Sequence, residues 1–273
     1  MVDVKIIADS ISPSGKRITT FQLKYWRAIH AEVMTHRMFS RSASSSRAIP
    51  VEKMLEQVRT DPAGPIFWGA NKPGMQAGSE LTGTDLDTAK NVWKYASLLA
   101  AERAESMARI GVHKQIANRL LEPFQYIHVV LTATEFENFF NLRIHPAAQP
   151  EIQELAREMK KAQDESIPKQ LFRGDWHIPY IQESEENLPL EIKLKISTAR
   201  CARVSYKNHD NSSPDVNKDV ELHDRLVGSV PLHASPAEHQ AQCRGDTQYY
   251  KNFVGWTQYR YIVESNINQL GAK

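Results

Sequence analysis

The segment from Thr35 to Arg47 constrains the fold and function of this chain more than any other stretch. Its thirteen residues include three arginines, one histidine and six hydroxyl side chains, and it follows an apolar-periodic run over residues 21–34. A segment of this kind cannot be buried, so we expect a loop at the end of a helix. Arginine guanidinium groups, hydroxyls and backbone N–H groups are the donors that a phosphate prefers. The alternative is a solvated surface loop without a ligand.

Composition and charge favour an ordinary globular protein. The 273 residues can bury a sizeable core, and no boundary divides them, so we expect a single domain over residues 1–273. The net charge of +2 gives no reason to expect a nucleic-acid polymer as partner. No stretch resembles a membrane span or a signal peptide, which indicates a cytoplasmic protein without membrane contact. Cys201 and Cys243 form no disulfide framework and suit a reducing compartment.

Periodicity predicts alternating strands over residues 2–9 and 17–24 and a buried strand over residues 126–132. Helical spacing predicts helices over residues 25–34, 51–58, 84–111, 114–121, 134–142, 150–163 and 220–230. The helix over residues 84–111 is the strongest, with Thr84 and Asp85 as its cap. Its apolar stripe consists of Val92, Tyr95, Leu98, Leu99, Met107 and Ile110. The aromatic, alternating tail over residues 249–263 predicts a closing strand.

Several segments together resemble the flavin-dependent thymidylate synthases, the ThyX family. Thr35-His36-Arg37, followed seven residues later by Ser45, Ser46 and Arg47, resembles the family's Arg-His-Arg triplet with its serine and arginine. Residues 138–143 and 148–152 resemble the family segment Asn-Phe-Leu-x-Leu-Arg … Ala-Gln-x-Glu-Ile. Residues 112–123 are similar to the family helix that carries Ala-Arg near a Leu-Pro end.

Two further motifs of the family stand in an unusual order. Residues 200–206 (Arg-Cys-Ala-Arg-Val-Ser-Tyr) and 233–239 (His-Ala-Ser-Pro-Ala-Glu-His) resemble motifs that normally precede the triplet. Here they follow it, as in a circular permutation, with a permuted segment over about residues 195–264. Permutation is tolerated when the old and new termini lie close in space. It predicts that residues 249–263 pack near residues 2–24.

The resemblance implies an α+β fold, with a central, mostly antiparallel sheet flanked by helices. It also implies a homotetramer whose active sites lie between subunits. The implied reaction is reductive methylation of deoxyuridylate (dUMP) at C5. Methylenetetrahydrofolate and NADPH are the implied co-substrates and FAD is the implied cofactor, while the protein supplies orientation and cationic stabilisation.

The resemblance assigns two roles in catalysis. Arg143 would contact the uracil ring and favour the charge that develops when C5 attacks an electrophile. Ser45 would bind and polarise the substrate, since no partner base is evident that could make it a nucleophile. A surface ion pair is the alternative for Arg143. The implied substrate-binding residues are Glu32, Ser45, Ser46, Arg47, Arg119 and Arg143, with Asn118 as the alternative to Arg119.

The implied cofactor-binding residues are His36, Arg37, Asn138, Leu142, His233, Ser235 and Glu238. A satisfied core histidine is the alternative for His36. Arg200 and Arg203 resemble the family's paired arginines, and structural ion pairs explain them equally well. The His233–His239 turn also resembles metal ligands, but Pro236 breaks the helix that an HExxH spacing needs, so we expect no metal.

The chain departs from the family pattern at several positions. Thr35 replaces the first arginine of the triplet. Glu32 stands where the family has a glutamine that contacts the substrate, and Ala43 replaces a glutamate of the family. Thr132 and Thr134 stand where the family often has Asn-x-Arg before its Asn-Phe-Leu segment. A changed substrate, product or flavin affinity therefore stays open. Three alternatives are C5 hydroxymethylation of a pyrimidine nucleotide, non-catalytic nucleotide or RNA binding, and a metal-dependent phosphohydrolase using His36, His233, Glu238 and His239.

Overall fold

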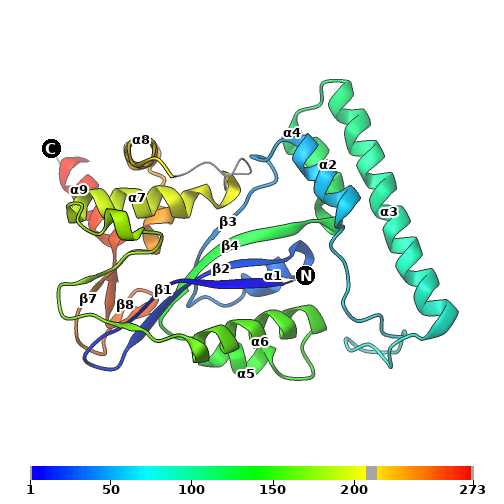
Figure 1. Ribbon diagram of the computed structural model, residues 1–273, viewed down its shortest axis with the longest axis horizontal. Coiled ribbons are helices and arrows are strands. Elements are labelled where there is room, and N and C mark those ends of the chain that lie inside the picture. Colours follow the sequence, from blue (N-terminus) through cyan, green and yellow to red (C-terminus); the bar gives the residue numbers. More distant parts are fainter. Residues whose placement is uncertain (1, 207–213, 272–273) are drawn as a thin grey trace.

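A five-stranded sheet lies at the centre of the protein (Figure 1). The computed structural model describes residues 2–206 and 214–271. Neighbouring strands are antiparallel throughout the order β3-β4-β2-β1, and β5 joins β1 in parallel. The predicted α+β fold with a mostly antiparallel sheet is confirmed. The strands are β1 (Asp3–Ile11), β2 (Arg17–Trp26), β3 (Ser40–Ala43), β4 (Tyr126–Ala133) and β5 (Lys169–Gln170).

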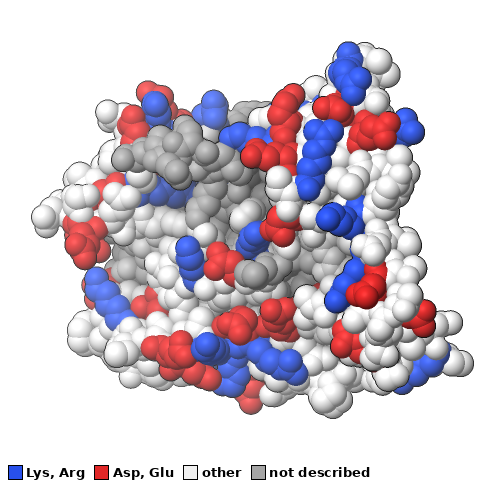
Figure 2. All heavy atoms as spheres, turned by 45° about the vertical axis from the view of Figure 1, so that its right-hand side comes forward, with Lys and Arg blue, Asp and Glu red and all other residues white. Residues whose placement is uncertain are grey.

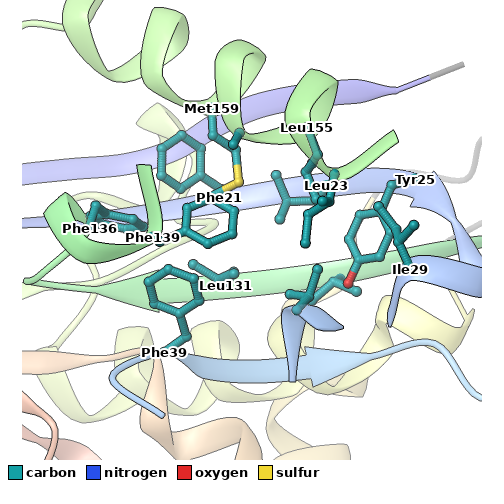
Figure 3. Close-up of a cluster of buried hydrophobic side chains, with 14 of the residues drawn as sticks. Phe21, Leu23, Tyr25, Ile29, Phe39, Leu131, Phe136, Phe139, Leu155 and Met159 are labelled. Carbon is teal, nitrogen blue, oxygen red and sulfur yellow. The ribbon is translucent and has the colours of Figure 1, made fainter. Parts of the chain in front are cut away.

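Two helices, α5 (Glu137–Arg143) and α6 (Pro150–Glu165), cover one face of the sheet (Figure 1). Side chains of a strand alternate between its faces, so every second residue of β2 and β4 points into this layer. Phe21, Leu23 and Leu131 meet Leu155 and Met159 of α6 there (Figure 3). The helix predicted over residues 150–163 is confirmed, and its residues Ile152, Leu155, Ala156 and Met159 are all buried.

The opposite face of the sheet packs against the C-terminal part of the chain. Val130 of β4 contacts Cys201 of α7 and Val204 of η4. A three-stranded sheet of β10, β7 and β6 and the hairpin β8–β9 complete this layer. The elements are β6 (Trp176–His177), η3 (Glu183–Glu185), α7 (Leu190–Ala202), η4 (Arg203–Tyr206), α8 (Val216–Val227), η5 (Ser235–Glu238), β7 (Ala241–Cys243), β8 (Tyr249–Tyr250), β9 (Phe253–Val254), β10 (Trp256–Gln258) and α9 (Tyr259–Gly271).

A helical lobe stands at the end of the sheet farther from α9 (Figure 1). It contains α2 (Val51–Thr60), α3 (Gly83–Arg109), α4 (Lys114–Ala117) and η2 (Asn118–Phe124). Acidic and basic side chains are interspersed along it (Figure 2), as in the pairs of Glu105 with Arg59 and Arg109. Among the helices of residues 2–206 and 214–271, none combines the length and apolar character that a membrane span requires.

The strongest predicted helix exists, but its orientation is unexpected. α3 buries the small side chains Ser97, Ala101 and Ala104 against α2 and η2, because small residues let helices approach closely. Five members of the predicted apolar stripe are exposed instead: Val92, Tyr95, Leu98, Leu99 and Ile110. The predicted cap is wrong as well, since Thr82 holds the N-cap position and makes no side-chain capping bond.

Two predictions around the arginine-rich segment are wrong. The helix predicted over residues 25–34 is reduced to η1 (Arg27–Ile29) and α1 (His30–Val33), because β2 continues its ladder with β4 as far as Trp26. The segment from Thr35 to Arg47 is no simple exposed loop, because β3 runs through it as an edge strand of the sheet. Ser40, Ser44 and Ser46 are buried, since neighbouring groups satisfy their hydroxyls.

The C-terminal tail is not one closing strand. Short strands β8, β9 and β10 are followed by α9, in which Arg260 and Glu264 form an i,i+4 ion pair. The tail nevertheless packs where the permuted order predicts. Trp256 and Phe253 share a buried cluster with Ile18 of β2, and Trp256 Nε1 donates to the Lys16 carbonyl at 3.2 Å. Segments at the two ends of the chain therefore meet.

Candidate active site

Arg143 lies in the last turn of α5 and holds three neighbours. Its Nε donates to His36 Nε2 at 2.9 Å, and its Nη1 donates to Glu32 Oε2 at 3.1 Å. Its Nη2 donates to Thr35 Oγ1 at 3.4 Å. We call these four residues the Arg143 cluster. The structure thus joins the motif of α5 to the triplet that begins at Thr35.

His36 is neutral in this cluster. Burial and the positive charges of Arg143 and Arg41 lower its pKa to about 4. Its ring packs edge-on against Phe139, with ring centres 4.8 Å apart. A neutral imidazole can accept the Arg143 hydrogen bond through Nε2, which an imidazolium could not do. The residue is therefore both a packed core histidine and an acceptor that orients Arg143.

The segment that follows β3, residues 44–49, forms a serine loop against η2. Ser46 Oγ donates to Glu122 Oε1 at 2.7 Å, and Arg119 Nη1 donates to the same oxygen at 2.7 Å. Asn118 is fully buried and donates to the carbonyls of Ser46 and Ile49 at 2.7 and 3.0 Å. Asn118 therefore holds the loop in place, while Arg119 presents a half-exposed cation beside it.

Within the serine loop, the backbone N–H of Arg47 donates to Ser45 Oγ at 3.4 Å. The Arg47 side chain is exposed, whereas Ser45 is half-buried. The loop therefore presents the Arg47 guanidinium beside the half-buried Ser45 hydroxyl, two groups that suit a phosphate, whereas the Ser46 hydroxyl is buried and donates to Glu122.

A pocket of about 430 Å³ lies between the early and late parts of the chain. We call it the Arg37 pocket; its lining residues are Arg37, Phe39, Arg41, Glu238, Lys251, Asn252, Gln258 and Arg260. Four of these carry positive charge and one carries negative charge. Glu238 forms an ion pair with Arg260. The surplus of positive charge suits an anionic ligand such as a diphosphate.

Only some of the implied cofactor residues meet in this pocket. Arg37 and Glu238 line it, although they lie 201 positions apart in the sequence. Asn138 and Leu142 are exposed on α5, and His233 and Ser235 are exposed just before Glu238. These four side chains are not among the described residues that line the pocket.

The histidine turn is a packing element in this chain. His239 is fully buried, and both its ring nitrogens are hydrogen-bonded, Nδ1 to Thr132 Oγ1 and Nε2 to Ser42 Oγ, each at 2.9 Å. Within residues 2–206 and 214–271, no three His, Cys, Asp or Glu side chains are grouped as metal ligands would be. His239 is therefore not available as a metal ligand, although the phosphohydrolase alternative requires it as one of four.

The paired arginines are engaged in ion pairs. Arg200 contacts Glu185 at 2.6 Å and Asp219 at 2.8 Å, and Arg203 pairs with Asp219. Asp219 is fully buried in this network. The alternative that both arginines serve in structural ion pairs therefore accounts for Arg200 and Arg203.

The two cysteines are unsuited to nucleophilic chemistry. Both are buried and unpaired, and burial raises the pKa of each thiol. A buried thiol with a raised pKa stays protonated, and the thiolate is the nucleophilic form.

Sequence reasoning missed most of the Arg37 pocket. Arg41 belongs to the arginine-rich segment, and this membership is the only signal that could have indicated it. Lys251 and Asn252 carry no motif signal, whereas Gln258 and Arg260 belong to the aromatic tail, residues 255–260, that could cover a site. Asn252 donates to the Met38 carbonyl and to Ser40 Oγ, at 3.2 and 3.0 Å, so the hairpin turn contacts the arginine-rich segment.

Comparison with known proteins gives one family match. The family described as thymidylate synthase complementing protein matches residues 12–169, more than half of the chain. No curated protein matches the sequence.

Two similar solved structures are of a UMP/dUMP methylase, PolB from Streptomyces cacaoi. The structure bound with 5-Br UMP is 17% identical, with a TM-score of 0.48, over 60% of this chain and 88% of that one. The structure bound with 5-Br dUMP is 18% identical, with a TM-score of 0.46, over 60% and 90% of the two chains.

Proposed function

The chain belongs to the thymidylate synthase complementing protein (ThyX) family, and we propose that it methylates dUMP at C5. The family resemblance drawn from the sequence motifs is thereby confirmed, whereas the reaction is our proposal. The observation that carries it is the Arg37 pocket, in which the triplet arginine and the glutamate of the late turn face one cavity.

The Arg143 cluster and the serine loop supply the substrate side of the proposed site. Ser45, Ser46 and Arg47 would bind the phosphate of dUMP, with Arg119 beside them. Arg143 would stabilise the charge that develops on the uracil, because preorganised donors stabilise charge better than mobile water. His36 and Glu32 orient its guanidinium through the bonds described above.

Arg37 and Glu238 would hold the cofactor, FAD, in the Arg37 pocket. The positive lining fits the diphosphate of that molecule. When bound, FAD supplies the hydride, drawn from NADPH, that completes the methyl group after methylenetetrahydrofolate has given its methylene carbon. His36, Asn138, Leu142, His233 and Ser235 would approach the same cofactor, the last four from exposed positions. The buried, protonated thiols suit a reaction that needs no cysteine nucleophile, and their unpaired state suits the cytoplasm.

We further propose a homotetramer with active sites between subunits. The exposed stripe of α3, with Tyr95 74% exposed and Val92 63% exposed, is apolar surface that a second copy would cover. Asn138, Leu142, His233 and Ser235 are exposed, as residues completed by a neighbouring subunit would be.

Product analysis tests the proposed reaction. The purified protein is incubated with dUMP, methylenetetrahydrofolate, NADPH and FAD, and the nucleotides are identified by mass spectrometry. We expect deoxythymidylate, heavier than dUMP by one methylene unit. A hydroxymethylated nucleotide would instead establish the alternative C5 modification. Unchanged dUMP with flavin-loaded protein would refute both.

A further inference from the structure

A second pocket adjoins the Arg37 pocket beside the hairpin β8–β9. It measures about 290 Å³, and we call it the hairpin pocket; its lining residues are Arg244, Tyr250, Lys251, Thr257, Gln258 and Tyr261. Lys251 and Gln258 line both pockets. All six residues lie outside residues 12–169, so the family match gives them no role.

The hairpin pocket combines aromatic rings with cations. The Arg244 guanidinium lies 5.5 Å from the centre of the Tyr250 ring, and the Lys251 ammonium lies 5.7 Å from the centre of the Tyr261 ring. Tyr261 is 54% exposed. Exposed aromatic rings beside cations are surfaces on which heteroaromatic bases stack.

Lys251 has a strained backbone at the boundary of the two pockets. Its φ of +59° lies in the left-handed region, in the two-residue turn between β8 and β9. Glycine and asparagine adopt this conformation at lower cost than lysine. Strained residues persist where the surroundings hold them and often serve binding. Its ammonium pairs with Glu264 at 3.0 Å and is half exposed, so it can still reach a ligand.

We infer that the hairpin pocket holds the adenosine end of a dinucleotide, whose diphosphate extends past Lys251 into the Arg37 pocket. Arg37 and Arg41 supply further positive charge on that side, whereas Arg260 is paired with Glu238 and Glu264. The inference rests on the proposed function, because it extends the cofactor assigned to the Arg37 pocket. FAD and NADPH both contain an adenosine diphosphate unit, whereas FMN lacks it.

Equilibrium titrations of the full chain with FAD, FMN and NADPH test this assignment in the wild type and in Lys251→Asn. We expect Lys251→Asn to weaken FAD binding about tenfold or more, because a charge-assisted contact is lost. FMN affinity and melting temperature should not fall, since asparagine tolerates the turn. Lys72→Asn, which removes an exposed loop lysine, is the matched control and should change no affinity.

Each outcome is decisive. A selective loss of NADPH affinity would support the pocket with NADPH as its ligand. Equal losses for FAD and FMN, or no loss, would overturn the adenosine assignment while the proposed function stands. Failure of the wild type to bind either flavin would overturn the proposed function and this inference together.

A second inference comes from a series of buried hydrogen bonds that crosses the central sheet. It joins, in order, Ser10, His177, Thr20, Thr132, His239 and Ser42, at 2.9, 2.8, 2.7, 2.9 and 2.9 Å. All members except Ser42 are buried. We call this series the hydroxyl–imidazole chain.

The bonds of this chain must all point the same way. A hydroxyl donates one hydrogen bond, and a neutral imidazole donates one and accepts one. Burial lowers the pKa of both His177 and His239 to about 3, so both are neutral at pH 7. A reversal at Thr20 or Thr132 would leave a buried hydroxyl proton without an acceptor, which is costly.

We propose that His177 and His239 share one tautomer and act as positioning residues for the Ser42 hydroxyl. With every bond directed toward Ser42, both histidines carry the proton on Nε2, and Ser42 keeps its own proton to donate to an anion at the arginine-rich segment. In the opposite direction both carry it on Nδ1, and Ser42 donates to His239 instead.

Long-range ¹⁵N–¹H spectra of the histidine rings test this proposal. We expect the same tautomer at both histidines, and a shift of both toward Nε2–H when dUMP is added. Thr20→Val interrupts the chain without touching His239, so it should still change the His239 ¹⁵N shifts. Thr19→Val, at the neighbouring buried threonine bonded to Asp9, should leave them unchanged. Opposite tautomers at the two histidines, or unchanged His239 ¹⁵N shifts in Thr20→Val, would overturn the coupling. Unchanged tautomers on addition of dUMP would overturn the positioning role.

Discussion

Arg143 shows how one residue gains its properties from neighbours far along the chain. Its guanidinium is held by Glu32, Thr35 and His36, more than one hundred positions earlier. The helix end could be read from the sequence, and so could the arginine, because the motif names it. The partners that orient it could not, since α1 is a single short turn with no periodic signal.

We expect Arg143→Ala to lower the turnover of dUMP by roughly 10²–10³-fold, the usual cost of removing a donor to a developing charge. It should also raise the pKa of His36, because one of the positive charges that lower it is removed. Turnover assays and an NMR titration of His36 measure the two effects. Arg157→Ala, on the neighbouring helix α6, is the control. Full activity in Arg143→Ala would remove our assignment of this residue.

At the scale of elements, α3 marks the limit of pattern reading. Its existence and length follow from helical spacing, and the helix was found where expected. Five residues of the predicted apolar stripe are exposed, because helical spacing does not say which side of a helix packs against the rest of the chain. The strand β3 escaped prediction because four residues of serine, arginine and alanine carry too little hydrophobic alternation, and its position depends on pairing with β4.

Leu99→Glu tests the proposed role of the α3 stripe. A charge buried in an apolar interface is costly, so we expect this variant to shift the protein to a smaller assembly in light scattering. Lys90→Glu, on the opposite side of the helix, should keep the wild-type mass. A wild-type protein that is already monomeric would contradict the proposed tetramer.

At the scale of the whole molecule, segments far apart in the sequence line one pocket. The permuted order of motifs predicted that the tail meets the first strands, and it does, through Trp256 and Ile18. Glu238 of the late turn and Arg37 of the triplet also line the same pocket. The charge that Lys251 adds to the pocket was beyond prediction, because no local pattern distinguishes this lysine from a surface residue.

The buried histidines of the hydroxyl–imidazole chain predict acid sensitivity. The folded-state pKa of His177 and of His239 is about 3, below the unfolded value of 6.5. The unfolded state therefore binds more protons between these values, so stability is complete above pH 6.5 and falls as the pH drops toward 3. Each histidine contributes a loss of about 1.4 kcal/mol per pH unit in that window.

Urea denaturation at pH 7, 6 and 5 measures this effect. We expect the free energy of unfolding to fall at each step. In His177→Gln it should fall less steeply with pH, because the contribution of one histidine is removed. Equal stability at pH 7 and pH 5 in the wild type would show that these imidazoles are not held neutral by burial.

The most direct measurement of the central claim is a flavin titration of the purified protein, followed by absorption, in the wild type and in Arg37→Ala. Our account predicts that the wild type binds FAD, that NADPH bleaches the bound flavin, and that Arg37→Ala weakens binding about tenfold or more. A wild-type protein that binds no flavin, or an Arg37→Ala variant with unchanged affinity, would contradict a cofactor site built from the two ends of this chain.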